Sequence, residues 1–311
     1  MKLYKRKPGD TAPPGQPDPY MIRARDGRYY VYATWPEGAQ LYSSDSLLDG
    51  WEYEGVCLDM TGQKNCWAPC VVEIDDKYYM YYSSMDDDCD DEHGQTLRVA
   101  VSDSPHGPFR KIKDLLPPFS IDPHVVQTPS GLYLFYSNNE YQAERVGTVI
   151  SCDKMKDPFT VEEKPVCVVC PTIDEEIYQR DRFRKGEHWH TIEGAFYFHT
   201  GNTHFLMYSG ACHQNPTYFI GYSYAHGAPD ADLRTLEWKK YPDNNTYSPL
   251  LPRNDFMEGM GHNSVIRDGG KYYIVYHGRD IGTGNLPEDY RCARIDEMKV
   301  EGDAITVQIT P

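Results

Sequence analysis

The sequence predicts an all-β, five-bladed β-propeller, formed by a single domain over residues 1–311. Three observations support this: a motif that occurs five times, the spacing between its copies, and short strands rich in tyrosine. A length of 311 residues would by itself favour about two domains of roughly 150 residues. The repeat overrides that expectation, because each copy describes one unit of a larger ring.

Each copy of the motif begins with a polar or small residue and a turn-forming residue, and continues with a short apolar run. The copies lie at residues 17–22, 67–72, 121–126, 192–196 and 261–266. In four copies a tyrosine follows the motif start at one constant offset, in the pairs Asp18 and Tyr32, Ala68 and Tyr82, Asp122 and Tyr136, and His262 and Tyr276. From Glu193 to Tyr208 the offset is longer by one position. Successive copies start roughly 50 to 70 residues apart, a spacing that fits a four-stranded antiparallel blade with its loops.

The strands around the repeated tyrosines combine β-branched and aromatic residues, as strands prefer. We predict such strands at residues 29–33, 78–82, 132–136 and 272–276. Hairpin turns are predicted at residues 26–27, 75–76, 129–131, 201–202 and 268–270. Helical periodicity is weak throughout, and the best helical candidate spans residues 174–185.

The charge balance narrows the classes of partner. With 31 basic and 47 acidic residues, the net charge of −16 argues against nucleic acid or an anionic membrane as the main partner. No apolar run is long enough for a transmembrane helix, and the first residues lack the apolar core of a secretory signal. We therefore expect a cytoplasmic protein.

Nine cysteines, an odd number without framework spacing, predict free thiols in a reducing compartment. Cys167 and Cys170 have the CxxC spacing of a zinc or redox site. They lie in a segment that we predict as a strand, and no second CxxC pair follows.

The innermost strand of each blade lines the axis of a propeller, so the motif starts should converge there. These positions hold Asp18, Ala68, Asp122, Glu193 and His262. A single Asp-Pro dipeptide would indicate only a turn. Three carboxylates brought together repel one another and resist burial, so their occurrence in three copies predicts a functional site.

Glycoside hydrolysis uses this set of groups. One carboxyl must be protonated to donate to the leaving oxygen, and a second must be ionised to activate water or attack carbon. A third carboxylate can orient the acid and raise its pKa. The sequence contains no phosphate loop, dinucleotide fingerprint or Gly-x-Ser-x-Gly elbow that would indicate other chemistry.

The motif starts resemble glycoside hydrolase family 43, inverting enzymes on a five-bladed propeller. Residues 43–51 and 99–109 also resemble outer-strand motifs of that family's first two blades, and the resemblance runs from about residue 16 to 280. It implies Asp18 as general base, Glu193 as general acid, and Asp122 as the group that orients the acid and modulates its pKa. Ala195 departs from the family's usual Glu-Gly-Pro, and the longer offset in this copy predicts a one-residue bulge or insertion after Glu193.

Three further residues are candidates for the site. Trp67 would form an apolar wall of a sugar subsite, or pack within its strand. Arg279 resembles a family arginine that binds substrate hydroxyls, although a surface ion pair would explain it equally simply. His262 would lie near the axis, where the family often holds a calcium ion or a water cluster. We expect no cofactor for the chemistry itself.

The resemblance implies an enzyme that releases L-arabinofuranose, D-xylose or both from plant-derived oligosaccharides. An inverting glycoside phosphorylase is an alternative that needs a phosphate site, for which Arg180, Arg182 and Arg184 are candidate donors. A non-catalytic carbohydrate-binding propeller is a third hypothesis. The acidic run at residues 86–92 is expected at the rim of the pocket, as a solvated loop or a calcium site. The sequence leaves the oligomeric state open.

Overall fold

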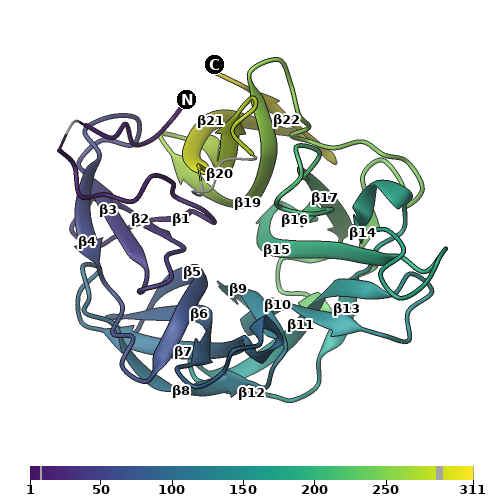
Figure 1. Cartoon of the computed structure of the whole chain (residues 1–311), viewed down its shortest axis with the longest axis horizontal. Coiled ribbons are helices and arrows are strands. Elements are labelled where there is room, and N and C mark those ends of the chain that lie inside the picture. Colours follow the sequence, from purple (N-terminus) through teal and green to yellow (C-terminus); the bar gives the residue numbers. More distant parts are fainter. Residues whose placement is uncertain (8, 285–289, 311) are drawn as a thin grey trace.

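A computed structural model describes residues 1–7, 9–284 and 290–310. Its strands form five antiparallel blades that follow one another around a ring (Figure 1). Blade I contains β1 (Tyr20–Arg23), β2 (Tyr29–Ala33), β3 (Gln40–Ser44) and β4 (Glu52–Val56). Blade II contains β5 (Gln63–Ile74), β6 (Lys77–Asp86), β7 (Thr96–Ser102) and β8 (Arg110–Leu116). Blade III contains β9 (Ser120–Thr128), β10 (Gly131–Glu140) and β11 (Gly147–Asp157), with β12 (Thr160–Val161) and β13 (Val166–Val169) both paired to β11.

The remaining strands complete the ring. Blade IV contains β15 (Trp189–Thr200), β16 (Thr203–Gly210), β17 (Phe219–His226) and β18 (Lys239–Lys240), and β14 (Ile177–Gln179) pairs with β15. Blade V contains β19 (Met257–Asp268), β20 (Lys271–Asp280), β21 (Cys292–Glu301) and β22 (Ala304–Gln308). Short 3-10 turns lie at η1 (Glu92–Gly94), η2 (Asp174–Glu176) and η3 (Leu233–Thr235). The prediction of a five-bladed propeller is confirmed.

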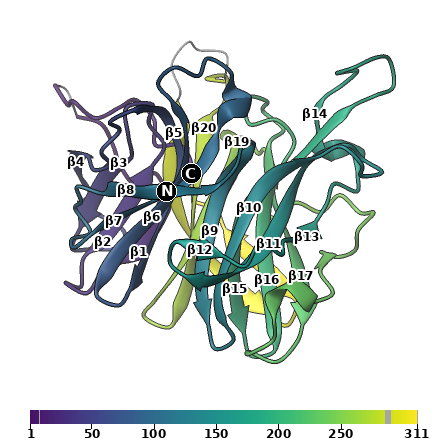
Figure 2. The same ribbon diagram turned by 90° about the horizontal axis from the view of Figure 1, so that it is seen from below.

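The helix predicted over residues 174–185 is wrong. The segment contains the turn η2 and the short strand β14, and Figure 2 shows the β14 region projecting beyond the blades. The carboxylate of Glu176 is buried and accepts hydrogen bonds from the backbone N–H groups of Thr172 and Ile173, while its other oxygen accepts one from Lys240 Nζ at 2.6 Å. These contacts fold the chain back locally, so the acidic stretch does not continue as a helix.

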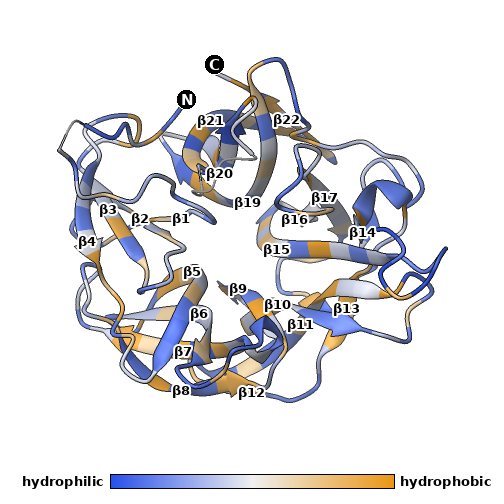
Figure 3. Cartoon of the chain, in the orientation of Figure 1, coloured by the Kyte–Doolittle hydropathy of each residue, from blue (hydrophilic) through white to orange (hydrophobic). Residues whose placement is uncertain are grey.

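The hydrophobic core consists of clusters between neighbouring blades, and hydrophobic positions gather on the strands while the connecting loops are mostly hydrophilic (Figure 3). The repeated tyrosines belong to these clusters: Tyr32, Tyr82, Tyr136, Tyr208 and Tyr276. All five are buried. Their hydroxyls can still be satisfied, as shown by Tyr32 donating to Pro105 O at 2.7 Å. The hydroxyls of Tyr82 and Tyr276 likewise donate to Gln63 and Asp296, so these tyrosines fill the space between blades while their hydroxyls remain hydrogen-bonded.

Blades III and IV are joined into one sheet by a parallel pairing of β11 with β15, in which Gly147 lies opposite His190 and Thr148 opposite Thr191. A Cβ atom on Gly147 would lie 2.1 Å from the carbonyl oxygen of His190. Only glycine permits this close approach. The pairing brings the loop after β10 beside the first residues of β15.

The ring is closed by the N-terminal segment, which adds to blade V. Leu3 N–H donates to Ala293 O at 2.9 Å, and Gln16 N–H donates to Arg291 O at 2.7 Å. Leu3 is buried in the cluster between blades I and V. In the described ranges, no helix is long and apolar enough to cross a membrane.

Candidate active site

The five motif starts share an unusual backbone conformation. Positive φ angles occur at Asp18 (53°), Ala68 (45°), Asp122 (54°), His262 (43°) and Gly194 (66°). Non-glycine residues seldom adopt this conformation, because the Cβ atom crowds the backbone. Four of the five blades therefore have a non-glycine residue in the strained left-handed conformation at the equivalent position, and the fifth blade has a glycine there.

Gly194, and not Glu193, is the structural equivalent of the other four motif starts. In β9, Asp122 and Pro123 lie opposite the single residue Tyr136, and in β15 Gly194 and Ala195 lie opposite Tyr208 in the same way. Counted from Gly194, the offset to Tyr208 equals that of the other blades. The predicted bulge after Glu193 is present, as it is in β5, β9 and β19, but the alternative of an insertion is wrong, since the residues from Gly194 to Tyr208 keep the common spacing.

The chain brings Asp18, Asp122, Glu193 and His262 to one cavity of about 340 Å³. Trp67 lines the same cavity, so its side chain is placed to contact a bound molecule. The other lining residues come from all five blades and their loops: Thr34, Glu92, His93, Phe119, Ile121, Asn139, Thr148, Tyr178, Arg182, Trp189, Thr191, His213, Tyr218 and Arg291. Glu92 shows that the acidic run reaches the rim, as expected.

Asp18 is held as an ionised carboxylate. Thr34 Oγ1 donates to Asp18 Oδ2 at 2.6 Å, and Arg291 Nη1 lies 3.3 Å from Asp18 Oδ1. Burial alone would raise the pKa of this carboxyl, but the charge of Arg291 leads the effects that outweigh burial and hold the pKa well below its usual range. The Asp18 N–H donates to Nδ1 of His277 at 3.1 Å, and burial lowers the pKa of that imidazole to about 4.

Glu193 is held as an acid. Burial raises its pKa to about 7, and the negative charge of Asp18 acts in the same direction. The hydroxyl of Tyr218 donates to Glu193 Oε1 at 2.7 Å and opposes this rise, as does the charge of Arg291. Below about pH 7, Asp18 is therefore ionised while Glu193 keeps its proton.

Asp122 adds a third carboxyl to the same space. Its Oδ2 accepts a hydrogen bond from Gly194 N–H at 3.1 Å, so it contacts the residue next to Glu193. Burial and the negative charges of Glu193 and Asp18 raise the pKa of Asp122 well above its usual range. Because the repulsion between Asp122 and Glu193 is mutual, the pair retains a proton under conditions in which Asp18 has lost its own.

His262 lies between the carboxylates of two blades. Its Nδ1 is 3.5 Å from Asp18 Oδ1 and 3.9 Å from Asp122 Oδ2, and burial lowers its pKa. Calcium prefers oxygen ligands, usually six to eight. Across the described ranges, no group of three or more His, Cys, Asp or Glu side chains is arranged to hold a metal ion. The prediction that His262 lies at a central calcium site stays a prediction.

The prediction that Arg279 binds substrate is not supported by its position. Its guanidinium donates to the carbonyl oxygens of His213, Gln214 and Asn215 at 2.9, 3.2 and 3.1 Å. Arg279 therefore holds the loop that brings His213 to the cavity. The arginine that reaches the carboxylates is Arg291, which sequence reasoning missed because it lies outside the repeated motif.

The three arginines considered for a phosphate site go to different places. Arg182 lines the main cavity, Arg180 lines a second cavity beyond Tyr178, and Arg184 is paired with Glu187 at 2.5 Å. A phosphate pocket needs several donors directed at one point. Arg180, Arg182 and Arg184 therefore do not converge on one phosphate site, which was the feature that suggested a phosphorylase.

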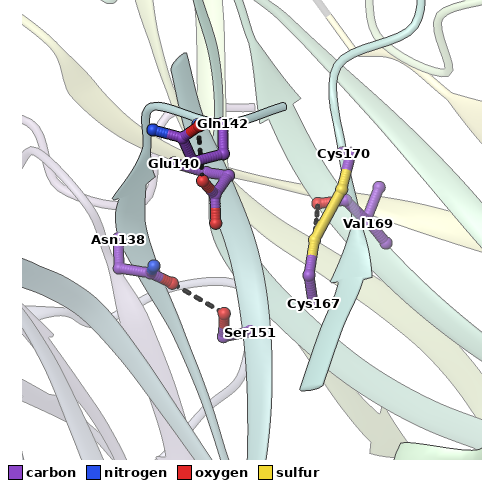
Figure 4. Close-up of a disulfide and its surroundings, with 7 residues drawn as sticks. All are labelled: Asn138, Glu140, Gln142, Ser151, Cys167, Val169 and Cys170. Atoms are coloured by element: carbon purple, nitrogen blue, oxygen red, sulfur yellow. Dashed lines mark hydrogen bonds between the residues drawn. A yellow bond between two sulfur atoms is a disulfide. The ribbon is translucent and has the colours of Figure 1, made fainter. Parts of the chain in front are cut away.

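The expectation that all cysteines are free thiols is wrong for one pair. Cys167 and Cys170 form a disulfide at the end of β13, the strand predicted for this segment (Figure 4). The bond lies on an outer strand of blade III and contributes no group to the cavity lining.

Comparison with known proteins identifies the class of this site. A propeller with carboxyls of lowered and raised pKa at its axis has the groups that glycoside hydrolysis uses. Residues 12–305 match the model of glycosyl hydrolases family 43, and the chain belongs to that family. A thermostable family-43 glycoside hydrolase of known structure is 30% identical, with a TM-score of 0.79 over 95% of this chain and 93% of that one.

More distant relatives share most of the chain. The probable arabinan endo-1,5-alpha-L-arabinosidase C of Aspergillus fumigatus is 24% identical over 90% of this chain and 87% of its own length. The extracellular exo-alpha-(1->5)-L-arabinofuranosidase of Streptomyces chartreusis is also 24% identical, over 84% of this chain and 79% of its own length.

Proposed function

We propose that the chain is an inverting glycoside hydrolase that releases L-arabinofuranose, D-xylose or both from plant-derived oligosaccharides. The observation that carries the proposal is that Asp18 and Glu193 line one cavity, where the pKa of Asp18 is lowered and that of Glu193 is raised. The names of the two arabinan-degrading relatives support a pentose substrate.

In this mechanism Asp18 removes a proton from a water molecule that attacks the anomeric carbon, while Glu193 protonates the departing oxygen. Thr34 and Arg291 keep Asp18 ionised and oriented, which a general base needs. The carboxyl of Asp122 accepts a hydrogen bond from the N–H group of Gly194, and its electrostatic repulsion with Glu193 favours retention of a proton by the pair. Both observations support Asp122 as the group that modulates the acid. The chemistry needs no cofactor, because both proton transfers use side chains of the chain. Calcium at the axis would act only on structure.

The test compares Glu193→Ala with Asp18→Asn on aryl α-L-arabinofuranosides and aryl β-D-xylosides, with a chelator present. General acid–base groups typically contribute about 10²–10⁴-fold to the rate. We expect Glu193→Ala to lose least on the aryl group that leaves most easily, because such a group needs little protonation, and Asp18→Asn to lose activity on every substrate. The anomer formed first, followed by NMR, should be inverted.

A Glu193→Ala variant with wild-type rates would overturn the acid assignment, and retained configuration would overturn the inverting mechanism. Turnover that depends on phosphate would favour the phosphorylase instead. Binding of pentosides without any turnover would favour the non-catalytic hypothesis.

A further inference from the structure

Three aromatic side chains lie together where the cavity meets the surface. Trp189 lines the cavity, and its ring centroid is 5.4 Å from that of Tyr141 and 6.1 Å from that of Phe183. Tyr141 and Phe183 are each 57% exposed, the highest values among the large hydrophobic side chains on the described surface. Large exposed aromatic groups next to a cavity indicate a binding surface, because packing does not account for them.

The cluster lies on the same wall as Glu193. Trp189, Thr191 and Glu193 occupy alternate positions of β15 and all line the cavity. At about 3.3 Å per residue, the four steps from Glu193 to Trp189 span roughly 13 Å. The wall therefore leads from the acid at the axis to the aromatic cluster at the rim.

The indole of Trp189 is fixed from several sides. Its Nε1 donates to Thr148 Oγ1 at 3.4 Å, across the parallel pairing of β11 with β15. The guanidinium of Arg182 lies 5.0 Å from the centroid of the Trp189 ring, and its Nη1 donates to Gln179 Oε1 at 3.2 Å. A ring held in this way offers a rigid surface with little entropy left to lose on binding.

The neighbours of the cluster suit a sugar. Asn139, Thr148 and Thr191 line the wall with polar groups, and Arg182 adds a charged donor. A sugar ring has an apolar C–H face that can pack on an aromatic ring, and hydroxyls at its edge that require hydrogen-bond partners. Pockets that combine aromatic surface with a few placed polar groups are typical of such ligands.

We propose that Tyr141, Phe183 and Trp189 form a subsite for sugar rings on the leaving-group side of the bond that is cleaved. The proposal rests on the proposed function, because a leaving group that Glu193 protonates must begin beside Glu193. The next rings then follow the β15 wall outward. The protein is therefore a hydrolase that selects oligosaccharides with two or more sugar units beyond the cleaved bond.

The test measures kcat/KM for Tyr141→Ala, Phe183→Ala and the double variant. The substrates are an aryl pentoside and linear arabino- and xylo-oligosaccharides of two to five units. In the wild type, kcat/KM should rise with chain length for the series that is cleaved. In the double variant the ratio of kcat/KM for the tetramer to that for the aryl pentoside should fall about tenfold, because each lost ring contact is comparable to a stacked aromatic pair.

Phe159→Ala is the matched control, since Phe159 is a 38% exposed phenylalanine that lies outside both cavity linings. Thermal unfolding verifies that each variant folds. Calorimetric titration of arabinotetraose and xylotetraose into Glu193→Gln, with and without the double substitution, should show weaker binding when the rings are removed.

An unchanged tetramer-to-aryl ratio together with unchanged tetraose binding would overturn the subsite. A wild-type protein without pentosidase activity, or a Glu193→Ala variant with full activity, would instead overturn the proposed function. The two failures are therefore distinguishable.

Discussion

Asp18 and Glu193 show how neighbouring side chains shift the pKa of a carboxyl group in opposite directions. Asp18 is buried and Glu193 is partly buried, and removal from water on its own favours the protonated form of each carboxyl. Arg291 lies 3.3 Å from Asp18 and reverses the effect there. At Glu193 burial prevails, because the hydrogen bond from Tyr218 and the charge of Arg291 only reduce the rise.

The pH dependence of activity should report these two environments. Because Asp18 must be ionised and Glu193 protonated, kcat/KM should decline above about pH 7, where Glu193 loses its proton, and should remain high well below that value. The Tyr218 hydroxyl stabilises ionised Glu193, so Tyr218→Phe should raise the pKa of Glu193 and move the alkaline limb upward by about one pH unit. A pH profile of kcat/KM tests this. A limb that stays in place or moves to lower pH would contradict the assignment of this limb to Glu193.

At the scale of the element, the inner strands β5, β9, β15 and β19 each have a bulge at their residue of positive φ. In β15 this position is Gly194, whose φ of +66° would strain any other residue. A Cβ atom there would also lie 3.1 Å from Nδ1 of His262. Blade IV thus has a glycine directly after the acid, and His262 of blade V lies close to the α-carbon of that glycine. The two inner strands therefore approach each other closely at the axis.

The substitution Gly194→Ala should therefore lower catalytic activity as well as stability. The control is Gly201→Ala, at the hairpin between β15 and β16, where φ is +58° and a Cβ atom would meet nothing within 4 Å. Each substitution should lower the free energy of unfolding by about 1–2 kcal/mol for the left-handed conformation. Only Gly194→Ala should also lower kcat, by about 10²-fold, because a small displacement of the acid misaligns proton transfer. Urea unfolding and steady-state kinetics separate the two effects, and a Gly194→Ala enzyme with wild-type kcat would show that the close approach does not matter.

At the scale of the whole molecule, the ring depends on joining its first and last blades. The N-terminal segment carries out this closure through backbone hydrogen bonds to β21 and through burial of Leu3 between blades I and V. The axial cavity has lining residues from both of these blades, including Asp18 and His262. Stability of the closure and integrity of the site are therefore coupled.

Leu3→Ala should destabilise the whole propeller. Removing a buried leucine side chain costs about 2–5 kcal/mol, and the lower part of that range is expected here because Leu3 lies near the surface of its cluster. Lys5→Ala, a change at an exposed residue of the same segment, should have little effect. Thermal and urea unfolding of the two variants test the closure. Equal stability of both would show that the segment contributes little.

Much of the fold could be predicted because the repeat is local. Each copy contains its own turn, apolar run and buried tyrosine. The number of blades and the convergence of Asp18, Asp122, Glu193 and His262 can therefore be predicted from the order of residues along the chain. The error at Glu193 has a physical cause: in blade IV the acid precedes the residue of positive φ, whereas Asp18 and Asp122 have that conformation themselves. Aligning Glu193 with Asp18 and Asp122, when Gly194 is their structural equivalent, made blade IV look one residue longer than the other blades.

The propeller, its interblade tyrosines, Asp18 and Asp122 could be predicted because residues at a constant offset encode them. Which side chains act on the axial carboxyls follows only from how the chain folds. Thr34 and Tyr218 reach Asp18 and Glu193 within their own blades, whereas Arg291 of blade V reaches Asp18 of blade I because the ring is closed. At the rim, Phe183 meets Trp189 within blade IV, and Tyr141 of blade III meets it across the pairing of β11 with β15. Contacts of this kind have no period along the chain, and so they leave no pattern from which they could be predicted.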